Sequence, residues 1–325
     1  MSDFKLQDSK FPPSAPSENI REPSRPSSFF DMIPTTDTTT NPPAKGDDWN
    51  HLAQEYLKFS SGPGTIPIKR LVERTNALLP YSRATGVLDN GCGPGPVMSR
   101  LIEEHGHEIP SSCSLLAADF SEGMVAQVEE RKKAAVAAAE VGGKGEVWAR
   151  VRTQVLDATD LQGVPDGSQS HVLAGWVYFM TQDPARCLTE SLRVLAPGGV
   201  LGCTAWEGSQ WLDMMNTLSE VRPDKELPKL PEKWSDAELL KGELEVAGFQ
   251  DVTCERVLTK MQFERHETLA EFLLTKMPHT IALTKDMSAE EVEAYKQAAV
   301  RKCKEYCPNA PGELQGWSLM ALGRK

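Results

Sequence analysis

Short apolar segments alternate with amphipathic ones from about residue 85 to 206, and this alternation restricts the fold more than any other feature of the sequence. The patterns that predict strands lie at 85–90, 114–120, 148–156, 171–177 and 200–206. Helical patterns separate several of them, at 96–105, 122–140 and 184–195. Strands and helices that alternate at this spacing are typical of a mostly parallel sheet covered on both faces. We therefore predict a doubly wound α/β domain.

The C-terminal third of the chain has a different rhythm. It predicts helices at 210–221, 235–247, 267–277 and 288–306, and strands at 251–263 and 314–322. The last strand brings the sheet to seven. The helices between the last two strands look like an insertion, and we expect it to cap a pocket.

The N-terminal segment, residues 1–46, is rich in Pro, Ser and Thr and has no sustained apolar period. Such a segment buries too little surface to offset its ordering entropy, so we predict a disordered tail. Helical patterns at 49–59 and 66–79 follow it. The expected domain therefore covers 47–325.

Composition excludes several classes of protein. The net charge of −11 argues against a nucleic-acid partner, and no apolar run approaches the length of about 20 residues that a membrane span needs. The chain has no secretory signal pattern, so we expect a cytoplasmic protein, monomeric or homodimeric, with a small-molecule substrate. Its seven cysteines are scattered, and none forms a cluster with metal-ligand spacing, so no metal is expected.

A glycine-rich turn is the strongest local signal. The segment 87–95 reads Val-Leu-Asp-Asn-Gly-Cys-Gly-Pro-Gly, a strand that ends at an acid, a turn, and the start of a helix. A dinucleotide fingerprint has its glycines spaced G-x-G-x-x-G, whereas here Pro96 occupies the place of the later glycine. Asp89, just before the turn, would repel a pyrophosphate and suit an amino group. The turn therefore favours a phosphate-free nucleoside, S-adenosylmethionine, over NAD.

With these motifs the chain resembles the class I S-adenosylmethionine-dependent methyltransferases, in particular the ubiquinone/menaquinone-type small-molecule enzymes and their fungal secondary-metabolism relatives. The resemblance spans about 48–325, with its motifs in 85–206. It implies a Rossmann-like methyltransferase fold whose helical additions, at about 47–80 and 264–310, cap the pocket. It also implies S-adenosyl-L-homocysteine as the product.

The resemblance assigns a cofactor site residue by residue. Gly91, Cys92, Gly93 and Gly95 would lie against the methionine part, and Asp89 would help to orient its amino group. Asp119 would accept hydrogen bonds from the ribose hydroxyls, Phe120 would lie beside the adenine, and Ser121 would cap the next helix. Asp157 and Ala158 would contact the adenine edge, with Asp160 as a competitor for that place. The carbonyl of Gly175, beside Trp176, would hold the cofactor's amino group.

The catalytic group is not predicted by any motif. Some family members have a histidine near the position of Met180, and this chain does not. Tyr56, Tyr178 and His266 are weak candidates for a base, but a thiol, an amine or an acidic phenol would need little help. Tyr56, Trp176, Tyr178, Trp206 and Trp211 either wall a pocket for an apolar or aromatic acceptor or fill the core.

We therefore predict methyl transfer to O, N or S of a small molecule. Two alternatives remain open: a non-catalytic or regulatory protein that uses the same pocket, and an NAD-dependent oxidoreductase.

Overall fold

A seven-stranded sheet in the order β3-β2-β1-β4-β5-β7-β6 forms the centre of the protein. The structure is a computed structural model that describes residues 65–138 and 143–325. The strands are β1 (Gly86–Asn90), β2 (Ser114–Asp119), β3 (Val151–Val155), β4 (Gln169–Gly175), β5 (Leu195–Ser209), β6 (Gln250–Phe263) and β7 (Gly312–Arg324). The strands from β3 to β5 pair in parallel, and β7 runs antiparallel to both of its neighbours, β5 and β6. The predicted doubly wound α/β fold with seven strands is confirmed.

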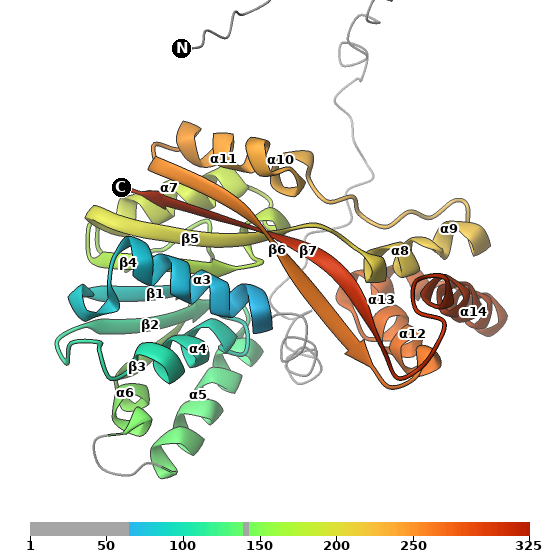
Figure 1. Ribbon diagram of the computed structural model, residues 1–325, viewed down its shortest axis with the longest axis horizontal. Coiled ribbons are helices and arrows are strands. Elements are labelled where there is room, and N and C mark those ends of the chain that lie inside the picture. Colours follow the sequence, from blue (N-terminus) through green and yellow to red (C-terminus); the bar gives the residue numbers. More distant parts are fainter. Residues whose placement is uncertain (1–64, 139–142) are drawn as a thin grey trace, which may run out of the picture. The chain divides into compact units, whose positions relative to one another are not determined.

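Helices cover both faces of the sheet (Figure 1). On one face lie α3 (Thr65–Leu78), α4 (Pro96–His105) and α5 (Glu122–Ala137), with α6 (Lys144–Arg150) packed on α4 and α5. The other face carries α7 (Pro184–Val194), α10 (Glu232–Ser235) and α11 (Ala237–Val246). Apolar side chains from the strands and both helical layers make the main core.

The strand order reverses between β1 and β4, and this reversal positions the site. From β1 the chain winds through α4 to β2 and then to β3, whereas β4 and β5 continue on the other side of β1. The connections that leave the carboxyl ends of β1 and β4 therefore lead to opposite faces of the sheet. Ligands of open α/β sheets bind in the crevice at such a switch point.

The long strands β6 and β7 leave the main sheet as an antiparallel ribbon and carry a second core (Figure 1). This core packs α8 (Gln210–Asn216), α9 (Leu218–Val221), α12 (His266–Thr275) and α14 (Ala289–Tyr306) together, with α13 (Pro278–Thr284) beside α12. The predicted insertion between the last two strands is thus a helical subdomain. Trp206, near the end of β5, packs against both cores.

Several predicted boundaries are wrong in detail. The strand expected at 148–156 begins only at Val151, because α6 extends to Arg150 and buries the Trp148 ring in the main core. The single helix expected at 210–221 is divided at Thr217 into α8 and α9. The helices α10 and α13 were not predicted.

The N-terminal predictions lie mostly outside the described residues. These are the tail 1–46, the helix 49–59, and residues 47–64 of the expected N-terminal cap. The described part of that cap, α3, packs along the sheet rather than over its edge. Within 65–138 and 143–325, no helix has the length and apolar character to cross a membrane.

Candidate functional site

Three glycines shape the turn between β1 and α4. Gly91, Gly93 and Gly95 have φ angles of 73°, 52° and 84°. Residues with a Cβ adopt such positive φ angles only at an energetic cost. The backbone N–H groups of Gly91 and Cys92 both donate to the Ala118 carbonyl, at 2.7 and 2.8 Å. The turn is thereby fixed to the end of β2.

Close packing also requires glycine at two of these positions. A Cβ on Gly91 would overlap the side chain of Val177, and one on Gly95 would lie 3.2 Å from Cγ2 of Val128. Packing therefore explains the presence of glycine at positions 91 and 95 without reference to a ligand.

Asp89 presents an acceptor that the protein does not satisfy. The side chain is fully buried, and Oδ2 accepts the Met98 N–H at 3.0 Å. Oδ1 accepts no hydrogen bond, and the same is true of Oδ1 of the neighbouring Asn90. Burial, with a smaller contribution from the charge of Asp119, raises the pKa of Asp89 to about 7. The two side chains follow each other in a strand and point to opposite faces, Asp89 toward Met98 of α4 and Asn90 toward Tyr178. A buried acceptor without a partner is costly, so Oδ1 of Asp89 is suited to a ligand that brings a donor.

Asp119 ends β2 and joins it to the glycine turn. Its Oδ2 accepts the Gly93 N–H and its Oδ1 accepts the Ser121 N–H, both at 2.9 Å. The side chain is 7% exposed, and burial raises the pKa of the carboxyl while the backbone bonds oppose this rise. A carboxylate has about four lone-pair sites, so two are left for other donors.

The residues after Asp119 differ in exposure. Phe120 is 40% exposed, which is unusual for a large apolar side chain next to a buried strand. Ser121 is buried, and its Oγ accepts the Met124 N–H at 3.2 Å, which caps α5. The structure thus gives Ser121 the capping contact expected from the sequence.

Asp157 lies on the exposed loop after β3. Its Oδ1 accepts both the N–H and the hydroxyl of Thr159, at 2.8 and 2.7 Å, and its carbonyl accepts the Asp160 N–H. Ala158 beside it is buried. The Asp157 carboxylate therefore forms a turn within its loop, and its contact with adenine stays a prediction.

The end of β4 carries a strained tryptophan. Trp176 follows Gly175 and has a φ of 56°, which is rare for a bulky residue and typical of functional sites. Its backbone N–H donates to Oγ1 of Thr204, and its indole N–H donates to Oγ of Ser318. The ring stacks on Trp206 at 5.0 Å between centroids. The two hydroxyl partners were not predicted, because no local pattern links residue 176 to residues 204 and 318.

Two of the three candidate bases bond to other groups of the protein. The Tyr178 hydroxyl is buried between Asn90 and Ser191, and burial raises its pKa. His266 lies beside the second core, where its Nε2 is 2.8 Å from the Cys307 carbonyl. Tyr56 lies outside the described residues. Tyr178 and His266 thus have structural partners.

Comparison with known proteins places the chain among methyltransferases. A family model described as a methyltransferase domain matches residues 88–203. The methyltransferase ucsB of Acremonium sp is 36% identical over 279 residues, covering 86% of this chain and 95% of that protein. The acetylaranotin bis-thiomethyltransferase of Aspergillus terreus is 26% identical over 216 residues, covering 64% of this chain and 69% of that protein.

Among solved structures, the YcgJ protein of Bacillus subtilis aligns with a TM-score of 0.48 at 14% identity. The alignment covers 78% of this chain and 97% of that one.

Proposed function

Since the chain belongs to the class I S-adenosylmethionine-dependent methyltransferases and acts on a small molecule, we propose that its acceptor is an apolar or aromatic metabolite methylated on S, N or O. The observation that carries the proposal is the edge formed by β1, β2 and β4. There a glycine turn, an unsatisfied buried oxygen of Asp89 and a strained tryptophan occur together.

The residues at this edge fit S-adenosylmethionine. Oδ1 of Asp89 lacks a donor, and the ammonium group of a methionine moiety is a donor. Asp119 has lone pairs left for two ribose hydroxyls, and the exposed ring of Phe120 suits the face of an adenine. When bound, S-adenosylmethionine supplies a methyl group on a positively charged sulfur.

The charges at the turn disfavour a dinucleotide. Asp89 and Asp119 are close enough for the charge of Asp119 to raise the pKa of Asp89. A pyrophosphate would add negative charge beside both carboxyls and would leave them without a counter-ion. A ligand with an ammonium and a sulfonium lowers this repulsion instead. This contrast supports S-adenosylmethionine over NAD.

Neither His171 nor His105 supports base catalysis. Desolvation lowers the pKa of His171 to about 4, and the ring packs on Tyr81, with Nε2 against the Leu79 carbonyl. His105 also packs on Tyr81. These rings lie toward the amino end of β4 and the last turn of α4, away from the glycine turn. We infer an acceptor that loses its proton without help.

A thiol suits this requirement best, because an ordinary thiol is ionised to a few per cent near neutral pH and its thiolate is a strong nucleophile. The thiomethyltransferase name of the Aspergillus terreus relative agrees with this choice. An acidic phenol or an amine is the next alternative. In each case the protein positions the nucleophile in line with the methyl carbon, and positioning alone supplies much of the acceleration.

Three tryptophans support an aromatic or apolar acceptor. Trp176 stacks on Trp206, and Trp211 meets Trp206 edge-on at 5.5 Å. They come from the ends of β4 and β5 and the start of α8, so they lie where the sheet meets the helical subdomain. Trp206 is only partly buried and therefore has ring surface to offer.

The experiment is a transfer assay with radiolabelled methyl donor and matched aromatic acceptors that carry a thiol, a phenol or an amine. We expect labelled product from the thiol first, with turnover that follows the ionised fraction of the acceptor as pH changes. A steep dependence of turnover on the titration of a protein group, with no dependence on the acceptor pKa, would contradict the inference that the acceptor loses its proton without help. Binding of S-adenosylhomocysteine without transfer to any acceptor would favour the regulatory alternative.

A further inference from the structure

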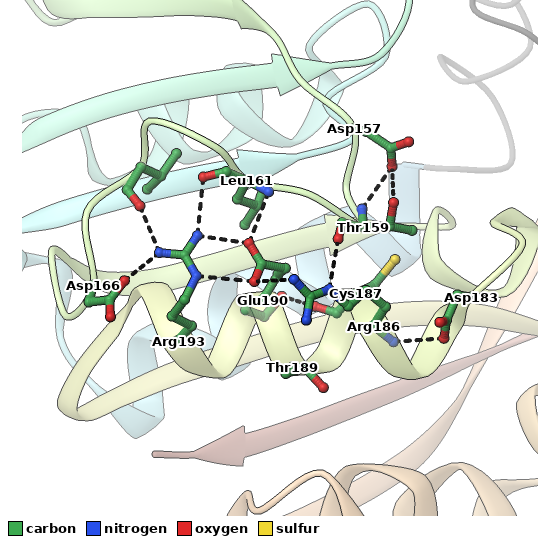
Figure 2. Close-up of polar contacts among 12 residues, drawn as sticks. Asp157, Thr159, Leu161, Asp166, Asp183, Arg186, Cys187, Thr189, Glu190 and Arg193 are labelled. Carbon is green, nitrogen blue, oxygen red and sulfur yellow. Dashed lines mark hydrogen bonds and ion pairs between the residues drawn. The ribbon is translucent and has the colours of Figure 1, made fainter.

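Charged side chains of α7 hold the loop between β3 and β4 (Figure 2). This loop carries Asp157, the residue proposed to contact adenine. Backbone groups of Thr159, Leu161 and Val164 all bond to side chains of α7. The loop is therefore braced along its length by one helix.

Glu190 is the centre of this brace. Its side chain is 5% exposed, and Oε2 accepts the Leu161 N–H at 3.0 Å. Arg193 donates to both carboxylate oxygens, at 3.1 and 2.7 Å, and these bonds hold the pKa of Glu190 below its ordinary value. A carboxylate with so little exposure is tolerated only when it is paired. Glu190 is thus charged and fixed.

The two arginines extend the brace to both halves of the loop. Arg193 donates to the carbonyls of Leu161 and Val164, at 3.1 and 3.0 Å, and pairs with Asp166. Arg186 approaches Glu190 at 3.4 Å, and its Nε donates to the Thr159 carbonyl at 3.3 Å. Each planar guanidinium fixes several groups at once.

Asp157 is connected to this brace through one residue. Its Oδ1 binds both the N–H and the hydroxyl of Thr159, and the carbonyl of Thr159 is the group that Arg186 holds (Figure 2). The carboxylate of Asp157 is therefore placed by Thr159, and Thr159 is placed by α7. Oδ2 of Asp157 is not used in this turn.

We propose that Glu190, with Arg186 and Arg193, is a positioning residue that sets how selectively Asp157 recognises the exocyclic amine of adenine. This proposal rests on the proposed function, since it assumes that adenine lies against the loop. It assigns to α7 a role in cofactor selectivity beyond its packing on β5.

The test compares two ligands that differ at one group. S-Adenosylhomocysteine has the exocyclic amine, and S-inosylhomocysteine has an oxygen there that donates no hydrogen bond to a carboxylate. Calorimetry gives the ratio of the two Kd values for each protein. A residue that only supports the fold would change both Kd values alike and leave the ratio unchanged.

Asp157→Ala, Glu190→Gln and a control variant show whether the brace sets the ratio of the two Kd values. In the parent we expect a ratio of about tenfold or more, because one charge-assisted hydrogen bond is lost with the inosyl ligand. Asp157→Ala should bring the ratio to about 1. Glu190→Gln, which keeps an acceptor for Leu161 but loses the arginine pairs, should lower it severalfold. Asp236→Ala, which removes the cap of α11, should keep the parent ratio.

Arg186→Gln guards against a folding defect in Glu190→Gln. The Arg186 side chain is half exposed, so its replacement leaves the core intact, and it should also lower the ratio. An unchanged ratio in both Glu190→Gln and Arg186→Gln, with a reduced ratio in Asp157→Ala, overturns the brace and leaves the proposed function standing. An unchanged ratio in Asp157→Ala overturns the inference as well. A parent that binds neither ligand contradicts the proposed function itself.

Discussion

Replacement of Asp119 by alanine separates its structural role from its proposed role in ligand binding. The variant leaves the N–H groups of Gly93 and Ser121 without their acceptor. Each such bond to a carboxylate contributes about 1.5–3 kcal/mol, so about 3–6 kcal/mol of unfolding free energy is at stake. Burial raises the pKa of Asp119, which means that the folded protein holds its charge at a cost. Removal of that charge recovers part of the loss, and we expect a decrease of about 2–4 kcal/mol.

The loss of ligand affinity is a separate effect. A hydroxyl that donates to a carboxylate contributes about 1.5–3 kcal/mol, which corresponds to roughly 10- to 150-fold in Kd. Calorimetric titration with S-adenosylhomocysteine measures this loss, and urea unfolding measures the stability.

Asp236→Ala is the matched control for this variant. Asp236 also accepts two backbone N–H groups, from Glu238 and Leu239, but it lies at the start of α11 on β6 and β7. The control should lose stability and keep the parent Kd. If Asp119→Ala binds S-adenosylhomocysteine as the parent does, the assignment of Asp119 to the ribose is wrong.

Three further predictions concern the same edge. Burial raises the pKa of Asp89 from its ordinary value of 3.8 to about 7, so between these pH values the folded state holds a proton that the unfolded state has lost. The unfolding free energy of the parent, measured with urea, should therefore fall relative to that of Asp89→Asn as pH rises from 4 to 7. The same change of unfolding free energy with pH in both proteins would contradict this. Gly91→Ala should lower the unfolding free energy by about 2–4 kcal/mol, through positive φ and overlap with Val177. Adding Val177→Ala should restore only the part of the unfolding free energy that is lost through the overlap, as measured by urea unfolding. Full recovery would show that the positive φ of residue 91 carries no strain. Tyr178→Phe should keep turnover within about twofold in the transfer assay, whereas a general base would cost about 100-fold or more.

Features that depend on neighbouring residues in the chain could be predicted from the sequence. The strand at 86–90, the glycine turn and the helix that starts at Pro96 are specified within ten residues, because glycine, proline and apolar periodicity act locally. The seven strands followed from the same periodicity. Trp148 shows the limit, since its apolar ring suits a strand or a buried helix face equally.

Contacts between distant residues could not be predicted in this way. The bond from the Trp176 indole to Ser318, and the pairing of Glu190 with the Leu161 N–H, depend on how strands and helices come together. The second core is a similar case, because residues from β5 to β7 form it only after β6 pairs with β7. The candidate ligand-binding residues could be predicted from the sequence, but the groups that hold these residues in place could not.

The structure of this protein crystallised with S-adenosylhomocysteine tests the central claim most directly. The account predicts the ribose hydroxyls on Asp119, the amino group beside Asp89, and the adenine between Phe120 and the loop of Asp157. A ligand bound elsewhere, or an Asp119 carboxylate that still contacts only Gly93 and Ser121, would contradict it.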